Sequence, residues 1–494
     1  MIESLMRLQW MLDLSMKTFD HVAQSRRLPL NLVLMTIVCS SVVRTGESAE
    51  PVRVGFGTAD ITPTLTPERP VWVAGIGPNN LAKQIHTRLN ADAIYLDDGT
   101  TSIAFVSVDL IGLQHDAVKR LRKRLEQVDY ACVSSTHTHA SPDVIGIWGP
   151  SRTKTGKDPH YVSFVEDKVV EAVRKARSSA VPAVATYGQV QATELLNDSR
   201  RPHVLDDVLR VMIFHRNDAD GEPLGILVQW SVHPQSVQGS NRPLSADYCA
   251  SLRDTLGEVY GCPVVFFIGA TGGYMNAVYS EEMKSAGRLG RAELYGQALA
   301  EVAKSAIASS EPVDLAPIAV HSRRIALPLA NPTFRRFTEI GVLDRELYRW
   351  RGRSDLLGEP LAKGESDSFL AIESEVALAR IGEIPVCLIP GEIYPELVYG
   401  GIVQPPDPRF DFPDAPAEPN ITSLLGTQRF LLFGLANDEV GYIIPKCQWD
   451  DRRPYGFNGT STYGERMSVG PDVAPIVLKA FEDCARSLKA EQQP

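Results

Sequence analysis

The chain has 494 residues, of which 44% are hydrophobic and 22% charged, so it is long enough to bury a large core in one or two domains. Its formal net charge of -10 at pH 7 argues against nucleic acid as a partner and provides no attraction to anionic membranes. The seven cysteines include no Cys-x-x-Cys pair, which disfavours a thiolate metal site and favours mostly free thiols.

Residues 1–50 look different from the rest of the chain. Arg26 and Arg27 precede an apolar run over 28–43, which is typical of a signal peptide and short for a membrane span. Ser25 followed by the two arginines also resembles a twin-arginine export signal. We therefore expect an exported protein, periplasmic or secreted, whose N-terminal extension is either cleaved or retained as an anchor. Residues 51–494 are predicted to form one large domain.

The remaining chain alternates between strand and helix patterns. An alternating strand at 52–57 opens it, and the segments 91–97 and 101–110 flank an Asp-Gly turn and predict a hairpin. Further predicted strands lie at 130–133, 183–190, 208–216, 224–233, 263–268 and 384–390, and predicted helices at 114–127, 159–178, 246–259 and 290–309. This mixture indicates an α/β fold with a mixed sheet in α+β layers. Residues 330–366 show no clear pattern and are interpreted as a lid or an insertion.

Polar side chains directly follow several of these apolar strands. His137 and His139 come after the strand at 130–133, and side chains two apart in an extended segment point to the same face. Because imidazole is the commonest metal ligand among side chains, this pair can supply half of a zinc site. His233 ends another strand, and Glu392 follows a Pro-Gly turn, where a carboxylate suits metal binding or acid/base chemistry.

Each of these residues also has an ordinary structural interpretation. His233 before a proline is often a hydrogen-bonded structural residue, Glu392 a solvated loop residue and Tyr442 a core residue. The glycine-rich turn over 269–276 can present backbone N–H groups to an oxyanion, but by itself it is weak evidence. The occurrence of all of these segments in one order is therefore the informative feature.

In that order the segments resemble the neutral, non-lysosomal ceramidase family along most of the chain after residue 51. The most specific pieces are Ser-Thr-His-Thr-His at 135–139 and Pro-Gly-Glu at 390–392. The other matching pieces lie at 54–62, 85–89, 233–242, 441–443, 463–465 and 470–471. The resemblance implies one ceramidase-like catalytic domain.

The resemblance also implies a site. The family's zinc is held by two histidines, a glutamate and a tyrosine, which by motif become His137, His233, Glu392 and Tyr442. By the same comparison His139 lies beside the reacting carbonyl and Tyr463 near the scissile amide. A family arginine matches Arg200 or the adjacent Arg201.

The chain departs from the family in two places. In ceramidases the glycine-rich turn reads Gly-Asp-Val-Ser-Pro-Asn, and its serine acts in amide cleavage. Here the turn over 269–276 has neither serine nor aspartate, and Thr271 offers a hydroxyl instead. The chain also ends soon after residue 471, where full-length ceramidases continue into a β-sandwich domain.

The expected function is an exported, zinc-dependent amidohydrolase acting on a small-molecule or lipid-like acyl amide. Zn²⁺ would activate a water that attacks the carbonyl, while His139 moves a proton. Tyr463, Arg200 and N–H groups of the 269–273 turn would stabilise the oxyanion. Two alternatives stay open because the serine motif is absent: a hydrolase of a non-ceramide ester or amide, and a non-catalytic zinc-binding scaffold. Peripheral membrane association also stays open, since burial of an acyl chain is apolar.

Overall fold

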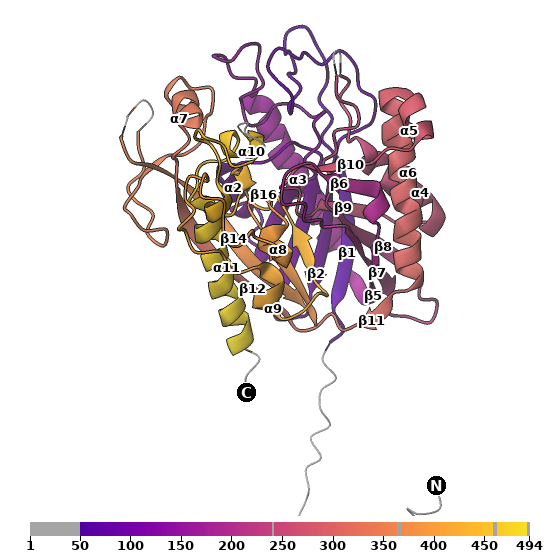
Figure 1. Ribbon diagram of the computed structural model, residues 1–494. Coiled ribbons are helices and arrows are strands. Elements are labelled where there is room, and N and C mark those ends of the chain that lie inside the picture. Colours follow the sequence, from indigo (N-terminus) through magenta and orange to yellow (C-terminus); the bar gives the residue numbers. More distant parts are fainter. Residues whose placement is uncertain (1–49, 240–241, 363–364, 366, 458–461, 492–494) are drawn as a thin grey trace, which may run out of the picture. The chain divides into compact units, whose positions relative to one another are not determined.

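The computed structural model describes residues 50–491 except 240–241, 363–364, 366 and 458–461, and residues 50–494 cluster as one unit (Figure 1). The predicted signal peptide or anchor lies outside the described residues, as does Asn241 of the matched 233–242 segment. Among the described residues, no helix combines the length and apolar character needed to cross a membrane. The six cysteines in this part of the chain are free and buried, as the sequence predicts.

The larger sheet has nine strands. Its order is β4 (Tyr130–Ser135), β3 (Ser102–Val108), β2 (Asn90–Asp97), β1 (Arg53–Asp60), β5 (Val181–Gln191), β7 (Val208–Arg216), β8 (Pro223–Trp230) and β9 (Val264–Ile268), with β11 (Glu311–Val313) paired to β5. Neighbours are antiparallel except the parallel pairs β3–β4 and β8–β9. The sheet curls, because β4 and β9 at the two ends of this order contact each other.

A second sheet packs against one face of the first. It contains β12 (Ile318–Pro328), β14 (Leu370–Ile381), β15 (Ile384–Leu388) and β17 (Leu431–Phe433), with β13 (Tyr348–Arg349) paired to β14. The core between the sheets is aromatic at its centre: the rings of Phe267 and Phe433 stack at 3.8 Å, and Phe105 meets Phe433 edge-on at 5.4 Å. Such pairs stabilise a core beyond their buried area.

Helices cover the outer faces of both sheets, which gives four layers in the order α/β/β/α (Figure 1). Outside the larger sheet lie α2 (His115–Arg122), α3 (Pro159–Ser178), α4 (Tyr248–Tyr260) and α6 (Gly287–Ala308), and outside the smaller sheet lies α11 (Val473–Ala490). The alternation along β2 shows why: Ala93 and Tyr95 face the helical layer, whereas Ile94 and Leu96 face the second sheet.

Short elements join these layers. They are η1 (Thr193–Leu195), β6 (Leu196–Asp198), β10 (Met275–Ala277), α5 (Glu281–Ser285), α7 (Pro332–Glu339), β16 (Glu392–Ile393), α8 (Glu396–Tyr399), α9 (Ile421–Leu425), β18 (Tyr442–Ile443), η2 (Lys446–Gln448) and α10 (Tyr463–Arg466). Two of them, β16 and β18, form a separate parallel pair.

The predicted fold class is confirmed: the structure is a mixed α/β domain with a mixed sheet. The helix predicted at 159–178 has those bounds, and the predicted 91–110 hairpin is β2–β3. Sequence reasoning missed α11 and the long antiparallel pair β12–β14. The segment 330–366, interpreted as a lid or an insertion, contains α7 and β13 and lines a large cavity described below.

Two glycines on β1 bring α3 against the sheet. A Cβ atom built at Gly55 would lie 2.0 Å from the carbonyl oxygen of Ala176, and one at Gly57 would lie 2.3 Å from that of Ala172. Both neighbours are helix backbone atoms, which cannot move aside as a side-chain end can. The close approach of α3 to the sheet therefore depends on these two glycines.

We predict that Gly55→Ala lowers the free energy of unfolding by about 2–3 kcal/mol, because the helix must shift to relieve the overlap. The matched control is Gly257→Ala inside α4, where the nearest atom to a new Cβ lies at 3.5 Å. That control should be neutral or stabilising by up to about 1 kcal/mol, since alanine is the better helix former. Chemical denaturation measures both variants, and equal midpoints would contradict the expected clash.

Candidate metal centre

Four sequence-predicted ligands converge from the ends of separate strands. His137 follows β4 and His233 follows β8, so the larger sheet supplies both imidazoles. Glu392 belongs to β16 and Tyr442 to β18, and these two residues are direct partners in the parallel pair. The carboxylate and the phenol therefore enter the site side by side from the chain that follows the second sheet.

The side chains meet at short distances. Nε2 of His233 lies 2.9 Å from Oε2 of Glu392, and Nε2 of His137 lies 3.4 Å from the same oxygen. The Tyr442 hydroxyl is 3.5 Å from Nε2 of His233. His139 adds a third imidazole, with its Nε2 3.3 Å from that of His137. All of these distances fit groups arranged around one shared point.

Backbone carbonyls orient two of the imidazoles. Nδ1 of His137 lies 2.6 Å from the carbonyl oxygen of Ile111, and Nδ1 of His233 lies 3.0 Å from that of Met275. A carbonyl oxygen only accepts hydrogen bonds, so each Nδ1 carries a proton, and Nε2 is the nitrogen that offers a lone pair to the centre when the ring is neutral. His139 differs, because its buried Nδ1 has no partner among the described residues.

This donor set fits a metal ion. The ligand atoms of His137, His139 and His233 all lie within 4.8 Å of one another, so the three can hold a metal together. Glu392 is 5% exposed, and a buried carboxylate is costly unless positive charge compensates it. Anchored imidazoles around a buried carboxylate are what a cation needs, and His137 and His233 carry the outer hydrogen bonds usual for metal-binding histidines.

The electrostatics of these side chains show the same need for positive charge. Burial alone would lower the pKa of His137, but the Glu392 carboxylate outweighs it and raises that pKa to about 9. For Glu392, burial would raise the pKa, yet His137 and His233 hold it far below the usual range. Burial and the neighbouring imidazoles keep the pKa of His139 well below normal, so His139 stays neutral. A proton on His137 thus occupies the role that a cation would fill.

The backbone at His137 departs from the extended conformation assumed from the sequence. The strand β4 ends at Ser135, and His137 has φ of +65°, a left-handed conformation uncommon for residues other than glycine. The two histidines do share one pocket, as predicted, but not through strand alternation. Strained backbone of this kind is concentrated at functional sites, where the surrounding structure enforces it.

A small cavity of about 70 Å³ opens beside this centre, with room for roughly five water molecules. His137, His139, Glu392, Tyr442 and Tyr463 contribute to its polar side. Its remaining wall is largely apolar and comes from Ile111, Ile145, Ile147, Trp148, Leu329, Phe334, Leu343, Ile372, Met467 and Val469. Burial and the Glu392 charge raise the pKa of Tyr463 to about 12, so its hydroxyl remains a hydrogen-bond donor at neutral pH.

Glu439 is a member of the site that sequence reasoning quoted without giving it a role. It lines the same cavity, and its Oε2 is buried without a partner in the described part of the chain. Burial and the Glu392 charge raise the pKa of Glu439 to about 8. Gly112 leaves space for it, because a Cβ there would lie 2.7 Å from Cγ of Glu439. The sequence feature that could have indicated a role for Glu439 is its position three residues before Tyr442.

The structure does not place Arg200 or Thr271 in this cavity. Arg200 is buried behind it, where its Nη2 donates to Glu465 at 3.0 Å and its guanidinium lies 4.7 Å from the centre of the Tyr394 ring. Thr271 is fully buried, and its hydroxyl has no hydrogen-bond partner within the described ranges. Arg201 is exposed, so Arg200 is the buried member of the pair.

The glycine-rich turn holds His233 in place, and three of its N–H groups already have acceptors. The N–H groups of Gly269, Ala270 and Gly272 already donate to Trp230, Asp206 and Ile393. Met275 accepts hydrogen bonds from both the backbone N–H and the Nδ1–H of His233. A serine could not replace Gly272 without a shift, since a Cβ there would lie 2.3 Å from the Tyr394 ring.

The turn does contribute an aromatic residue to the site. The ring of Tyr274 lies 5.6 Å from that of Tyr442 and 5.7 Å from that of Tyr463. Its buried hydroxyl has no partner among the residues that the structure describes. Sequence reasoning considered this turn for its glycines and Thr271, and so missed the tyrosine.

No family model matches the chain. Among solved structures, the chain is similar to neutral ceramidase from Pseudomonas aeruginosa, with a TM-score of 0.62 and 18% sequence identity over 90% of this chain and 75% of that one. It is also similar to a ceramidase complexed with C2, with a TM-score of 0.59 and 17% identity over 90% of this chain and 76% of that one. At these identities the likeness shows a ceramidase-like fold.

We predict that the purified protein carries one equivalent of a divalent transition metal, and that His137→Ala, His233→Ala and Glu392→Ala lose it. Each change removes a ligand from a buried set and leaves the others uncompensated. Mass spectrometry of metal content measures this, with His160→Ala as control because that histidine is exposed on α3. A wild-type protein without metal after growth in zinc-supplemented medium would contradict the site.

We also predict that metal affinity rises with pH. A metal binds the deprotonated imidazole, and the pKa of His137 in the metal-free site is about 9. Between about pH 6 and 9 the association constant should therefore increase by about tenfold per pH unit and then level off. Competition with a chromophoric chelator at fixed ionic strength measures the slope, and a pH-independent affinity would contradict the displaced proton.

Proposed function

We propose that this chain is an exported, zinc-dependent hydrolase that cleaves amides carrying a short acyl group. The observation that carries the proposal is the pair of carbonyl-anchored imidazoles facing the buried Glu392 beside a small cavity. Zinc favours nitrogen and oxygen ligands, and His137, His233, Glu392 and Tyr442 would hold it. When bound, it supplies a Lewis acid that polarises a carbonyl and lowers the pKa of a water toward neutrality.

The residues around the cavity would divide the remaining work. Tyr463 donates its hydroxyl proton in a hydrogen bond to the carbonyl oxygen, which stabilises charge that develops there. Glu439 receives a proton at Oε2 and passes it to the leaving nitrogen, because an unpartnered carboxyl with a pKa near 8 suits a general acid and base. Neutral His139 orients the attacking water through an imidazole nitrogen.

Two observations support this reaction class and limit the substrate. The likeness to ceramidase structures supports hydrolysis of an amide bond. The cavity is partly open and offers about 70 Å³, which favours an acetyl-sized group beside the histidines over a long acyl chain. Its apolar wall suits the methyl end of such a group. The basic and apolar N-terminal segment supports export, through cleavage or as an anchor.

We predict that hydrolysis decreases as the acyl chain grows from two to sixteen carbons in a series of N-acyl amides with one common amine. A chelator should abolish the activity and added Zn²⁺ should restore it, because the carbonyl loses its Lewis acid. Tyr463→Phe should lower kcat by about 100-fold, the loss typical of one oxyanion donor, with metal content unchanged. Preference for the longest chain would contradict the cavity argument.

We further predict that Glu439→Gln lowers kcat by about 100-fold or more without loss of metal, since an amide cannot receive the proton. The control is Glu418→Gln, a second buried carboxyl with a raised pKa that lines a different cavity. Steady-state kinetics and metal analysis on both variants measure kcat and metal content. Retention of wild-type kcat in Glu439→Gln would remove this residue from the mechanism.

A further inference from the structure

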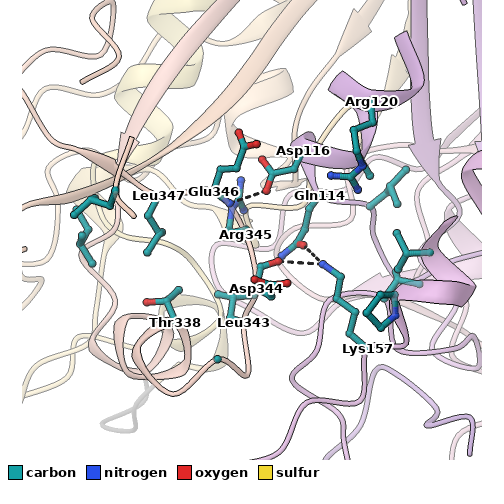
Figure 2. Close-up of a pocket in the computed structure, with 18 of the residues that line it drawn as sticks. Gln114, Asp116, Arg120, Lys157, Thr338, Leu343, Asp344, Arg345, Glu346 and Leu347 are labelled. Carbon is teal, nitrogen blue, oxygen red and sulfur yellow. Dashed lines mark hydrogen bonds between the residues drawn. The ribbon is translucent and has the colours of Figure 1, made fainter. Parts of the chain in front are cut away.

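A second, larger cavity adjoins the metal centre. Its volume is about 750 Å³, within the range of small-molecule sites, and it lies between α2, the start of α3 and the 338–370 segment (Figure 2). Three residues, Gln114, Leu343 and Arg345, line both this cavity and the small one beside the histidines. These three residues form a partition between the two spaces.

The partition carries hydrogen-bond donors that the protein leaves unused. Gln114 is 4% exposed, and Lys157 donates to its Oε1 at 2.8 Å, which fixes the orientation of the amide. Its Nε2 then has no acceptor among the described residues. The side chain of Arg345 is also 4% exposed, pairs with Asp438 at 3.0 Å and leaves its Nε without a partner.

Unused buried donors point to an acceptor supplied by a ligand. A buried N–H without an acceptor costs about 1–3 kcal/mol. Two such donors at one partition therefore favour binding of a ligand whose oxygen atoms accept their hydrogen bonds. Lys157 lies beside them and also donates to the carbonyl oxygen of Asp344 at 3.0 Å (Figure 2). The donors therefore favour a ligand with oxygen acceptors at the boundary between the two cavities.

Carboxylates outnumber cationic side chains along the wall of the larger cavity, but most of these charges already have a partner. Its ionised side chains are largely held in pairs, such as Arg120 with Glu166 at 2.6 Å, and Arg349 with both Glu365 and Asp367. Paired charges produce no strong field of one sign, yet their oxygens and nitrogens still offer many hydrogen bonds. A wall that combines paired charges with apolar side chains suits a ligand whose hydroxyl groups donate and accept hydrogen bonds and whose carbon ring packs on the apolar part.

We propose that the larger cavity binds a neutral, polyhydroxylated, sugar-like body whose short N-acyl group reaches through the partition into the metal cavity. This inference rests on the proposed hydrolysis and names its substrate class. The body lies between the paired charges and the apolar side chains of the larger cavity, Gln114 and Arg345 donate to its oxygens, and the acyl group enters the apolar space beside the histidines. Selectivity arises because an analogue without hydroxyls leaves those buried donors unpaired.

The test compares N-acetylglucosamine with N-cyclohexylacetamide, which share an acetamide on a six-membered ring and differ in the hydroxyls. Calorimetry on the purified full chain should show the sugar binding at least about tenfold more tightly. Gln114→Met keeps the side-chain length but removes the donor, and should weaken sugar binding by about two- to tenfold without affecting the cyclohexyl analogue. Arg345→Lys keeps the charge opposite Asp438 while removing Nε, and should do the same.

The control is Gln127→Met, an exposed change outside both cavities that should leave both affinities at wild-type values. Equal affinity for the two probes, or equal losses for both in Gln114→Met, would overturn the sugar-like class. Hydrolysis is assayed separately on the same probes and on the acyl series. Sugar binding without hydrolysis of any amide would contradict the proposed hydrolysis and support the sugar-binding cavity. Hydrolysis of simple amides without preference for the sugar would support the hydrolysis and contradict the sugar-binding cavity.

Discussion

The buried carboxylate of Glu392 is the constraint on which the rest of the centre depends. It lies between two imidazoles, 2.9 Å from His233 and 3.4 Å from His137, in a place with little access to water. An ionised carboxylate there requires positive charge, which either a proton on His137 or a metal ion can supply. Competition between these two cations would make metal uptake dependent on pH.

The same interaction joins the two sheets of the fold. His137 and His233 follow β4 and β8 of the larger sheet, whereas Glu392 follows β15 of the smaller one and pairs with Tyr442. Any ion held by these side chains therefore spans the boundary between the two sheets. The aromatic core around Phe267 and Phe433 fixes the distance between the sheets, and so also the distance between the ligands.

Two cavities of different size and different wall chemistry adjoin each other beside the candidate metal centre. The small one beside the histidines is tight and mostly apolar, and the large one beyond Gln114 and Arg345 combines paired charges with apolar side chains. A ligand with a short apolar end and a hydroxylated body matches this arrangement, whereas two long hydrocarbon chains do not. The likeness to ceramidase structures shows the fold, and the substrate body proposed above rests on the walls of the two cavities.

The sequence by itself determined the fold class and the main strands and helices of the larger sheet, and His137, His139 and His233 carried a local signal because they follow apolar strands. The grouping of Glu392 and Tyr442 with these histidines came from the resemblance to ceramidases. Only the tertiary structure decided the rest. Arg200 and Thr271 lie outside the cavity, and Glu439 and Tyr274 lie at the site, because which loop side chains face a cavity depends on packing between distant segments. The partition between the two cavities also depends on tertiary structure. Gln114 and Arg345 are 231 positions apart, and no local sequence pattern predicts that their unpaired donors line the same wall.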